Sequence, residues 1–366
     1  MGSIGERKSE HLALCAAEDV GFRKASTLLE CVRLVHDALP EMSAADVDLS
    51  VTLLGKSLRA PLVIASMTGG TDEAGLVNRE LASIAEQRGL GFGLGSQRAM
   101  HTRPGTESTY RVRDVAPTTL VLGNVGVVQG RTMTTSEIRV LVEEVGADAL
   151  CLHLNPAMEL VQPGGDRDFS QGLGTVARLV RDLGVPVVVK ETGCGIAPGV
   201  GRRLRDVGVR HVDVSGAGGT SWVGVETKRA QAAGDERARG LGEALWDWGV
   251  PTAAAVALLA PMGFDTIIAT GGIATGLDVA RAIALGATAA GIARPVLRAL
   301  SAGGREGATA LLDAIESELR AAMLLTGSRD LAALRRAPRV VVGELASWIA
   351  QLGREDHRQK VIRSKP

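Results

Sequence analysis

The sequence predicts an α/β fold, a (β/α)8 TIM barrel, and three observations support this prediction. Short apolar runs recur along the chain with amphipathic helical segments between them, the pattern of parallel strands joined by helices. Hydrophobic residues make up 45% of the chain but aromatic residues only 2%, so aliphatic side chains must build the core, as in strands covered on both faces. The 366 residues match the length of a barrel with additions.

Eight runs are expected to form the strands, because each is short and apolar and is followed by polar or glycine residues. In chain order they are Leu62–Ala65, Gly91–Leu94, Thr119–Leu122, Ala149–Leu152, Val185–Val189, Val209–Val214, Thr266–Ala269 and Ala289–Ile292. The segments between them carry apolar residues at helical spacing, among them Asn78–Arg88, Thr135–Val145, Val176–Leu183 and Leu277–Leu285. Glycine follows several of these segments, as at Gly89 and Gly286, where it can end a helix.

Three further segments belong to the single domain that we expect over residues 1–366. Residues 1–60 form an N-terminal extension before the first strand. Residues 222–249, rich in charge and glycine, are expected to form an inserted loop and helix after the sixth strand, as a lid over the active face. Residues 327–366, with Ala333–Arg336 and the apolar Val340–Val342, are expected to form a C-terminal helical cap.

Charge and cysteine content narrow the classes of function. The 41 basic residues are balanced by 41 acidic ones and aromatic residues are rare, so we expect no nucleic-acid-binding surface. The four cysteines are scattered without a CxxC pair, which is typical of reduced thiols in a cytoplasmic protein. The N-terminus lacks the apolar stretch of a secretory signal, and the longest apolar run, Thr252–Met262, is too short to span a bilayer. We therefore expect no membrane association.

Polar and glycine residues follow the predicted strands, so they should gather at the end of the barrel where this fold has its active sites. Gly271 and Gly272 follow the seventh strand, and Ala293 and Arg294 follow the eighth, where barrels commonly bind phosphate. Together these loops indicate a phosphate-bearing cofactor. Lys190 ends the fifth strand, where it could form a Schiff base, place positive charge beside an electron-rich cofactor, or simply be exposed.

The stretch after the fourth strand brings His153, Asn155 and Glu159 close together. These groups suit a magnesium ion shared with substrate phosphate oxygens, and the alternative for Glu159 is a solvated loop carboxylate. Met158, an unreactive thioether, stands among them. Near the N-terminus, the charged cluster Arg7–His11 is either a mobile tail, which composition favours, or a clamp for a diphosphate.

Several strings in the sequence are similar to those of type 2 isopentenyl diphosphate isomerases, flavoenzymes with a (β/α)8 fold. The matching strings are Arg7–Leu12, Ser66–Thr71, Gly93–Arg98, His153–Pro156, Gly165–Phe169, Val189–Glu191 and Asp213–Trp222, and the resemblance runs from about Arg7 to Gly353. It implies interconversion of isopentenyl and dimethylallyl diphosphate, with reduced FMN as an acid–base group, Mg²⁺ on the diphosphate and NADPH as reductant. It also implies a homo-oligomer, a tetramer or octamer.

The same resemblance assigns roles to individual residues. Catalytic roles fall to His153, Asn155 and Lys190, and the lysine would stabilise the anionic reduced flavin. FMN would be held by Ser66, Met67, Thr68, Ser96, Asn124, Lys190, Ser215, Thr220, Gly271, Gly272, Ala293 and Arg294. The substrate would contact Arg7, Lys8, His11, Ser96, Gln97, Arg98 and Met158. Glu159 would hold Mg²⁺, and the cluster at Arg7 and Lys8 would be a diphosphate clamp instead of a tail.

Three positions depart from the family pattern. Met158 replaces a glutamine implicated in the second proton transfer, Gly164 replaces a glutamate, and Ala274 replaces an arginine. Because a thioether cannot carry a proton at neutral pH, two interpretations follow. One is an isopentenyl diphosphate isomerase that tolerates Met158. The other is an FMN-dependent relative that isomerises or cyclises a different or longer prenyl diphosphate.

Two more distant interpretations complete the set. FMN-dependent 2-hydroxy acid oxidases share the barrel and the phosphate loops, but they use a histidine base where this chain has Ala217. A flavin-binding interaction protein that has lost catalysis is the non-enzymatic alternative. Bound FMN without turnover of any prenyl diphosphate would distinguish that protein from an enzyme.

Overall fold

Eight parallel strands close into a barrel in the computed structural model, which describes the backbone of residues 4–363 and the side chains of residues 7–353. The first three residues of the predicted extension and the last three of the predicted cap lie outside the described residues. The strands are β4 (Leu62–Ile64), β5 (Gly91–Gly93), β6 (Val121–Gly126), β7 (Ala149–Leu154), β8 (Val187–Glu191), β9 (His211–Asp213), β10 (Thr266–Thr270) and β11 (Ala289–Ile292). Each pairs with its neighbours in the sequence, and β11 pairs with β4 to close the ring. This confirms the predicted TIM barrel and its eight strands.

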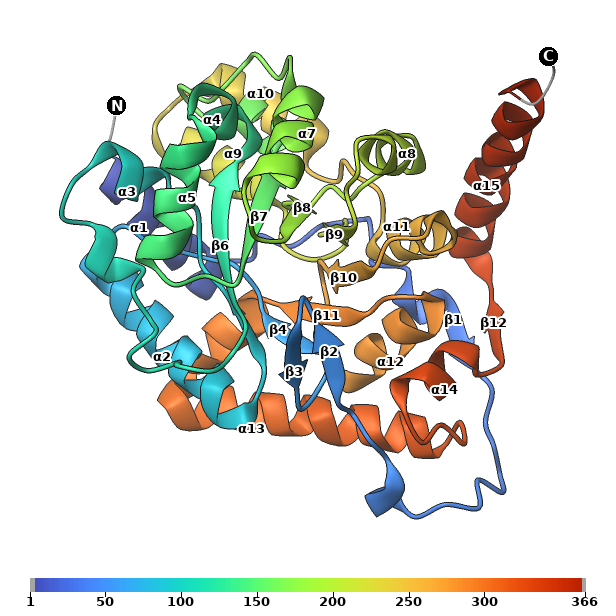
Figure 1. The fold of residues 1–366 in the computed structure, drawn as a ribbon. Helices are drawn as coiled ribbons and strands as arrows, with labels where there is room; N and C mark the ends of the chain where they lie inside the picture. The colour runs from blue at the N-terminus through green and yellow to red at the C-terminus, as the bar shows by residue number, and fades with distance from the viewer. Residues whose placement is uncertain (1–3, 364–366) are drawn as a thin grey trace.

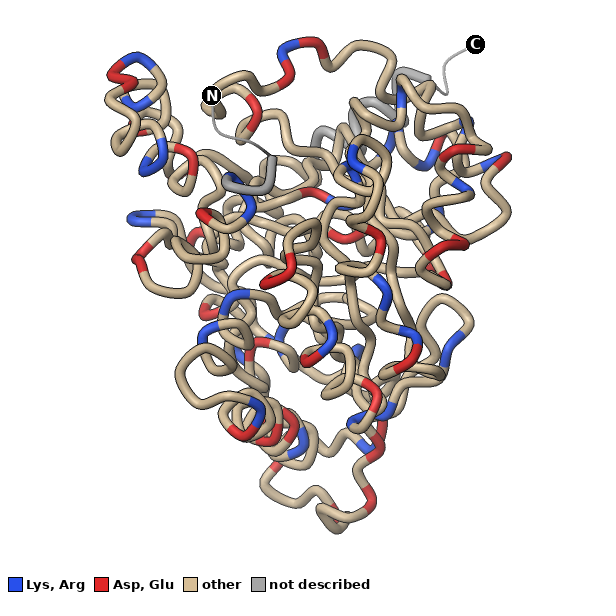
Figure 2. The backbone as a smooth tube through the Cα atoms, turned by 90° about the vertical axis from the view of Figure 1, so that its left-hand side faces the viewer, with Lys and Arg blue, Asp and Glu red and all other residues tan. Residues whose placement is uncertain are grey.

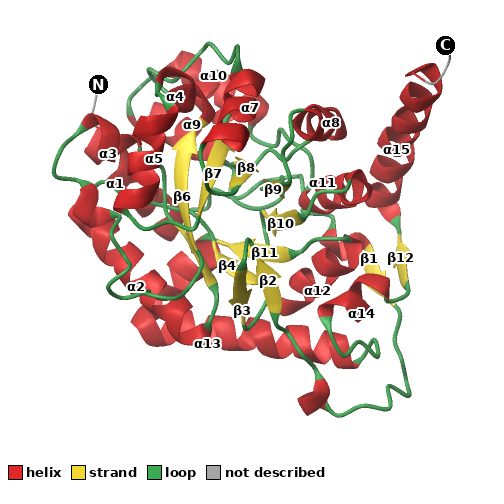
Figure 3. Ribbon diagram, in the orientation of Figure 1, coloured by secondary structure: helices red, strands yellow, loops and turns green. Residues whose placement is uncertain are grey.

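Helices surround the strands (Figures 1 and 3). Those that follow the strands in turn are α2 (Asp72–Arg88), α3 (Arg98–Thr102), α4 (Val127–Thr132), α5 (Thr135–Glu144), α6 (Pro156–Val161), α7 (Gly172–Asp182), α8 (Pro198–Asp206), α11 (Thr252–Leu259), α12 (Gly276–Leu285) and α13 (Arg294–Leu324). Threonine side chains cap the N-termini of α2, α5 and α12 by accepting backbone N–H bonds. Left-handed glycines at Gly89 and Gly286 end α2 and α12, as the sequence predicts.

Aliphatic side chains fill the space inside the barrel and between the barrel and its helices. Val63, Val188 and Ile268 belong to an inner cluster that also includes residues of the hairpin β2 (Val51–Leu53) and β3 (Lys56–Leu58). Leu53 and Leu58 of this hairpin are buried in the cluster, so the hairpin closes the N-terminal end of the barrel. The opposite end therefore remains for chemistry, as is usual in this fold.

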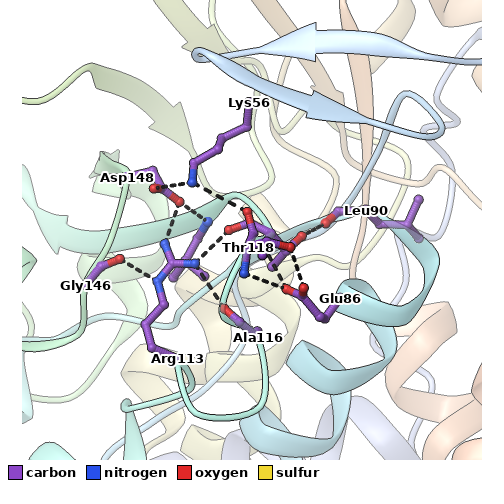
Figure 4. A network of polar contacts seen from close by, with 10 residues as sticks. Lys56, Glu86, Leu90, Arg113, Ala116, Thr118, Gly146 and Asp148 are labelled. Carbon is purple, nitrogen blue, oxygen red and sulfur yellow. Dashed lines mark hydrogen bonds and ion pairs between the residues drawn. The ribbon is translucent and has the colours of Figure 1, made fainter.

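A polar network lies at the closed, N-terminal end (Figure 4). Asp148 accepts a hydrogen bond from Arg113 (2.6 Å) and forms an ion pair with Lys56 of the hairpin (3.1 Å). Glu86 of α2 accepts backbone N–H bonds from Thr118 (3.0 Å) and Thr119 (2.8 Å). These contacts tie the hairpin, α2 and the starts of β6 and β7 together, which is a stabilising role.

The N-terminal extension begins at the open end of the barrel and ends in the β2–β3 hairpin at the closed end. It contains α1 (Ile4–Ala17), the short turns η1 (Leu29–Cys31) and η2 (Ala44–Asp46), and β1 (Val32–Leu34). Helix α1 packs against α13, α2 and α9 (Trp222–Ala232). After α1, the Ser221 N–H donates to the Val20 carbonyl (2.8 Å) and the Phe22 N–H donates to the Gly219 carbonyl (3.0 Å). The chain after α1 is thus fixed to the loop that follows β9.

The insertion after β9 forms two helices, α9 and α10 (Glu236–Leu245), where the sequence predicted a loop and one helix. The two helices pack closely against each other and against α6. Their close approach requires Gly242, because a Cβ there would lie 1.9 Å from the Thr227 hydroxyl oxygen. Trp222, at the start of α9, faces the open end of the barrel, and the function of the insertion as a lid stays a prediction.

The C-terminal region combines helices with one strand. α13 is kinked at Gly303 and Gly304 and is followed by α14 (Leu331–Arg336), at the position where the sequence predicted a helix. The valines after it form β12 (Arg339–Val341), which pairs antiparallel with β1, because β-branched residues favour an extended strand over a helical cap. α15 (Gly343–Arg363) then extends away from the barrel (Figure 1).

Charges of both signs are interspersed along the chain (Figure 2), which agrees with the balanced composition. Over the described residues, no helix combines the length and apolar character needed to cross a membrane.

Candidate active site

A cavity of about 630 Å³ opens at the C-terminal ends of the barrel strands. Its walls come from the loops after the strands, from α1 and from the start of α13. It brings together every predicted site residue except Gln97: Arg7, Lys8, His11, Ser66, Met67, Thr68, Ser96, Arg98, Asn124, His153, Asn155, Met158, Glu159, Lys190, Ser215, Thr220, Gly271, Gly272, Ala293 and Arg294. The structure thus gathers these residues in one place, whereas their individual roles stay predictions.

Three polar side chains form a row across adjacent strands. His153 on β7 is the register partner of Lys190 on β8, and Lys190 is the partner of Asp213 on β9. The Lys190 ammonium donates to the Asp213 carboxylate (2.8 Å), and the Thr270 hydroxyl donates to the same oxygen (3.0 Å). Both members of the ion pair are buried, so Asp213 supplies the counter-charge that a buried lysine needs. Sequence reasoning did not include Asp213 among the site residues.

The His153 imidazole is held by Asn124, whose side-chain oxygen lies 2.7 Å from Nδ1. Burial, with the nearby positive charges of Lys190 and Lys8, lowers the pKa of His153 to about 4. The ring is therefore neutral at neutral pH. If Nδ1 carries the proton and donates it to Asn124, Nε2 is left as an acceptor.

Glu159 is held in the first turn of α6, next to the cavity. Its carboxylate accepts hydrogen bonds from the Asn155 amide (2.9 Å) and the Asp166 N–H (2.8 Å). Gly165 passes so close that a Cβ there would lie 2.2 Å from the Glu159 carbonyl oxygen. These contacts fix the carboxylate without burying it completely.

The groups that line the cavity suit a magnesium ion whose other ligands come from the substrate. They do not suit a metal site formed by protein side chains alone. Glu159 is the one carboxylate among the described residues that line the cavity. Nowhere in the described ranges do three or more histidine, cysteine, aspartate or glutamate side chains form a metal-binding cluster. Mg²⁺ commonly binds through one or two carboxylates together with substrate phosphate oxygens and water, and Glu159 fits that arrangement.

Positive charge surrounds the rest of the cavity. Arg7, Lys8, Arg98, Arg294 and Arg298 all line it. Within the described part of the chain, the Nε atoms of Arg7 and Arg294 are buried without a hydrogen-bond partner. Buried guanidinium nitrogens without a hydrogen-bond partner, in a wall rich in positive charge, indicate that an anionic ligand completes the site.

Helix α1 is anchored at the cavity by a buried carboxylate that the sequence reasoning missed. Glu226 of α9 is fully buried, with His11 Nε2 2.7 Å from one of its oxygens and the Arg229 guanidinium 2.6 Å from the other. Burial alone would raise the pKa of Glu226, but the contacts with His11 and Arg229 outweigh it and lower the pKa. Arg7–His11 therefore lie in a fixed helix, which agrees with a clamp and not with the tail that composition favours.

The loops after β9 and β10 form a narrow glycine cradle that suits a phosphate group. A Cβ on Gly219 would lie 2.2 Å from the Gly272 nitrogen, so the two backbones touch. Gly271 and Gly272 adopt left-handed φ angles of 105° and 74°. The N-terminus of α13, where Arg294 begins the helix, also borders the cavity. Exposed backbone at such loops and at helix N-termini binds phosphate, so these residues fit the phosphate of FMN.

Gln97 differs from the sequence prediction of substrate contact. It is fully buried and does not line the cavity. Its amide donates to the Leu141 carbonyl (2.8 Å), and its oxygen accepts from the Asn124 N–H (2.9 Å). Gln97 thus supports Asn124, which holds His153, because a side-chain amide can pair with two backbone groups in the interior.

The three positions that depart from the family pattern have different surroundings. Met158 and Ala274 line the cavity. Gly164 does not, and no atom lies within 4 Å of the place where its Cβ would be. Met158 is the one of the two cavity departures that replaces a residue implicated in proton transfer.

Comparisons with known proteins agree with this geometry. Residues 155–340 match the family model described as FMN-dependent dehydrogenase. The isopentenyl-diphosphate delta-isomerase of Methanosarcina barkeri is 44% identical over 355 residues, which cover 96% of each chain. The enzyme of the same name from Aeropyrum pernix is 45% identical over 349 residues, or 94% of this chain and 92% of the relative.

Solved structures show the same fold at lower identity. A flavocytochrome b2 variant with bound sulfite has a TM-score of 0.68 at 19% identity, covering 94% of this chain and 84% of its own. A mandelate oxidase variant with (S)-mandelic acid has a TM-score of 0.62 at 19% identity, covering 91% of this chain and 94% of its own. At this identity the likeness concerns the fold alone.

Proposed function

This chain belongs to the isopentenyl-diphosphate delta-isomerase family, and we propose that it interconverts isopentenyl diphosphate and dimethylallyl diphosphate. The observation that carries the proposal is a single cavity that combines a phosphate cradle, a buried lysine and an arginine-rich clamp. The cradle suits a flavin mononucleotide, and the clamp suits a diphosphate.

FMN is the cofactor supported by the matching family model. The glycine cradle with Ala293 and Arg294 would hold its phosphate, and Lys190 would lie beside its ring. The remaining FMN-binding assignments, among them Ser66, Thr68 and Thr220, rest on their position in the cavity wall. When bound in its reduced form, FMN supplies an acid–base group that can exchange a proton with the alkene.

The substrate diphosphate would bind between α1 and the loops after β5 and β7. Arg7, Lys8 and Arg98 would pair with its oxygens, and Mg²⁺ held by Glu159 would neutralise more of its charge. His11 borders the same part of the cavity and is oriented by Glu226. Holding the diphosphate at this end would direct the alkene toward the row that contains Lys190.

His153 and Asn155 would orient the substrate as neutral hydrogen-bonding groups. The lowered pKa of His153 keeps the ring uncharged at neutral pH, so it does not compete with the cations for the diphosphate. Met158 would contact the alkene as an apolar wall, and a water molecule would replace the hydrogen bonds of the family's glutamine.

The likeness to the hydroxy acid oxidases does not extend to their base. Position 217 is a buried alanine beside Pro251, so no imidazole stands there to remove a proton from a hydroxy acid. This favours the isomerase over the oxidase function.

The proposal also covers the reductant of the flavin, the assembly of the enzyme and its location. NADPH would be the reductant of FMN, and the chain would assemble into a homo-oligomer, a tetramer or octamer, in the cytoplasm. Sedimentation velocity of the purified protein tests the assembly, and stopped-flow bleaching of the flavin by NADPH tests the reductant.

The proposed activity is tested with purified protein, reduced FMN, Mg²⁺ and isopentenyl diphosphate, by following the olefinic protons in NMR spectra. Dimethylallyl diphosphate should form, and removal of Mg²⁺ by a chelator should stop its formation. No product under reducing conditions with Mg²⁺ present would contradict the proposal.

A further inference from the structure

Tyr110, the single tyrosine of the chain, lies beneath the loop that joins β4 to α2. It is fully buried and does not line the cavity. Its ring packs so closely under the loop that a Cβ on Gly69 would lie 2.1 Å from a ring carbon. A Cβ on Gly70 would lie 3.1 Å from the tyrosine hydroxyl. Tyr110 thus supports a loop to which the resemblance assigns FMN contacts.

The hydroxyl of Tyr110 joins this loop region to the predicted substrate clamp. The Lys8 ammonium donates hydrogen bonds to the Tyr110 oxygen (2.6 Å) and to the Ser96 carbonyl (3.0 Å). The Tyr110 hydroxyl in turn donates to the same Ser96 carbonyl (2.8 Å). Two of the three donors of Lys8 are therefore used, and the third remains for a ligand in the cavity that Lys8 lines.

We propose that Tyr110 is a positioning residue for the substrate diphosphate, because it fixes the Lys8 ammonium at the cavity wall. The proposal rests on the proposed function, which makes the ligand a diphosphate. A free lysine side chain has many rotamers, and ordering it in advance lowers the entropy cost of binding. Tyr110 acts through Lys8, since its own atoms do not reach the cavity.

The surroundings of Lys8 disfavour its charged form, so the ammonium needs the hydrogen bonds to Tyr110 and Ser96. Burial, followed by repulsion from Arg7 and Arg103, lowers the pKa of Lys8 to about 7. Acceptors such as the Tyr110 oxygen and the Ser96 carbonyl favour the charged form of the amine. Burial raises the pKa of Tyr110 itself, so its hydroxyl stays protonated and can both donate and accept.

A double-mutant cycle tests the proposal with inorganic diphosphate and Mg²⁺ as the ligand and FMN-loaded protein. Isothermal titration calorimetry would compare the wild type, Tyr110→Phe, Lys8→Met and the double variant. We expect Tyr110→Phe to weaken binding about tenfold, the effect of one hydrogen bond to a charged group. The double variant should bind no more weakly than Lys8→Met alone, because Tyr110 acts only through the lysine.

The matched control is Thr119→Val, which removes another buried hydroxyl that donates to a backbone carbonyl, that of Leu90, at the closed end of the barrel. It should leave the diphosphate affinity unchanged. In steady-state turnover, Tyr110→Phe should raise KM about tenfold with less than a twofold change in kcat, a division that general loosening of the fold would not produce.

Two results would overturn the inference. The first is that Tyr110→Phe binds diphosphate as tightly as the wild type does. The second is that the loss of affinity in the double variant equals the product of the losses in the two single variants. If the wild type itself bound no diphosphate, both the clamp and the proposed function would be wrong. That result differs from normal diphosphate binding that is insensitive to Tyr110→Phe, which would contradict the role of Tyr110 alone.

A second measurement does not depend on the folding of Tyr110→Phe. Ultraviolet resonance Raman spectra report on Tyr110 alone among tyrosines, because the chain has only one. The tyrosine bands should shift between the wild type and Lys8→Met, since the variant loses the hydrogen bond to the phenol oxygen. Identical bands in the two proteins would contradict the contact on which the inference rests.

Discussion

Lys8 and His153 line the same cavity, and burial lowers the pKa of both side chains. The effect on charge differs between the two residues, because the ordinary pKa of lysine is far higher than that of histidine. His153 is neutral throughout the physiological range, whereas Lys8, with a pKa of about 7, lies at the point where its charge depends on the ligand. At the scale of single residues, the site is thus adapted to gain charge when an anion arrives.

This property predicts proton uptake on ligand binding. At pH 8 the free protein should carry Lys8 mainly as the neutral amine, since the pH exceeds its folded pKa of about 7. A bound diphosphate favours the ammonium and raises this pKa, so binding should take up to one proton from solution. Calorimetry in buffers of different ionisation enthalpy measures the number of protons.

Lys8→Met is the control for proton uptake, because it removes the titrating group. Uptake should be smaller in this variant and should also decrease in the wild type at pH 6, where Lys8 is already charged. Equal uptake by the wild type and Lys8→Met at pH 8 would contradict the assignment.

Met158 is one of two residues, with Ala274, at which the sequence departs from the family inside the cavity. If it serves as an apolar wall, Met158→Gln should leave KM unchanged and alter kcat by less than about threefold, a barrier change below 1 kcal/mol. Steady-state rates with reduced FMN and isopentenyl diphosphate measure this. A rise in kcat from near zero would instead show that methionine marks a changed substrate.

At the scale of elements, helix α1 connects the cavity to the inserted helices. Its contacts with the body of the protein include the pair of His11 with Glu226 and the pair of Glu10 with Arg229, both on α9. At its other end, Arg298 of α13 donates to the Ala16 carbonyl (3.1 Å). The helix that carries the clamp is therefore fixed by two elements that are distant in the sequence.

The anchor predicts a local effect for Glu226→Gln. The variant keeps the size of the side chain but removes a buried negative charge between His11 and Arg229, and breaking such a pair costs about 3–5 kcal/mol. We expect faster hydrogen–deuterium exchange in residues 4–17 and weaker diphosphate binding, with nearly unchanged FMN affinity.

Glu243→Gln is the matched control for this variant. Glu243 pairs with Arg23 at the surface, where both side chains are more than a third exposed, so losing the pair should change stability by less than about 1 kcal/mol. Exchange in α1 that is equally slow in Glu226→Gln and in the wild type would disprove the anchoring role.

At the scale of the whole molecule, local patterns made the barrel predictable. Each strand has an apolar run that can be identified from a few residues, and the order of the strands follows the order of the chain. The pairing of β1 with β12 joins the two ends of the sequence and leaves no local pattern. It appears only when the chain is folded, and the C-terminal valines were therefore expected in a helical cap.

In the site, too, local sequence patterns could be predicted, whereas contacts between distant parts of the sequence could not. Residues on strand ends, such as His153 and Lys190, could be predicted from their position and from the family resemblance. Tyr110 and Glu226 could not, because their partners on α1 are 102 and 215 residues away in the sequence. Gln97 has the residue type of a substrate contact, but only its buried partners show that it supports Asn124 instead.

We propose that one cavity holds both reduced FMN and a prenyl diphosphate for isomerisation. The most direct measurement uses deuterated buffer, with FMN either oxidised or reduced anaerobically by light without NADPH. We predict that deuterium enters dimethylallyl diphosphate and recovered isopentenyl diphosphate only with the reduced flavin, at a rate matching turnover. Equal incorporation with oxidised FMN, or none with reduced FMN and Mg²⁺ present, would contradict isomerisation by reduced FMN in this cavity.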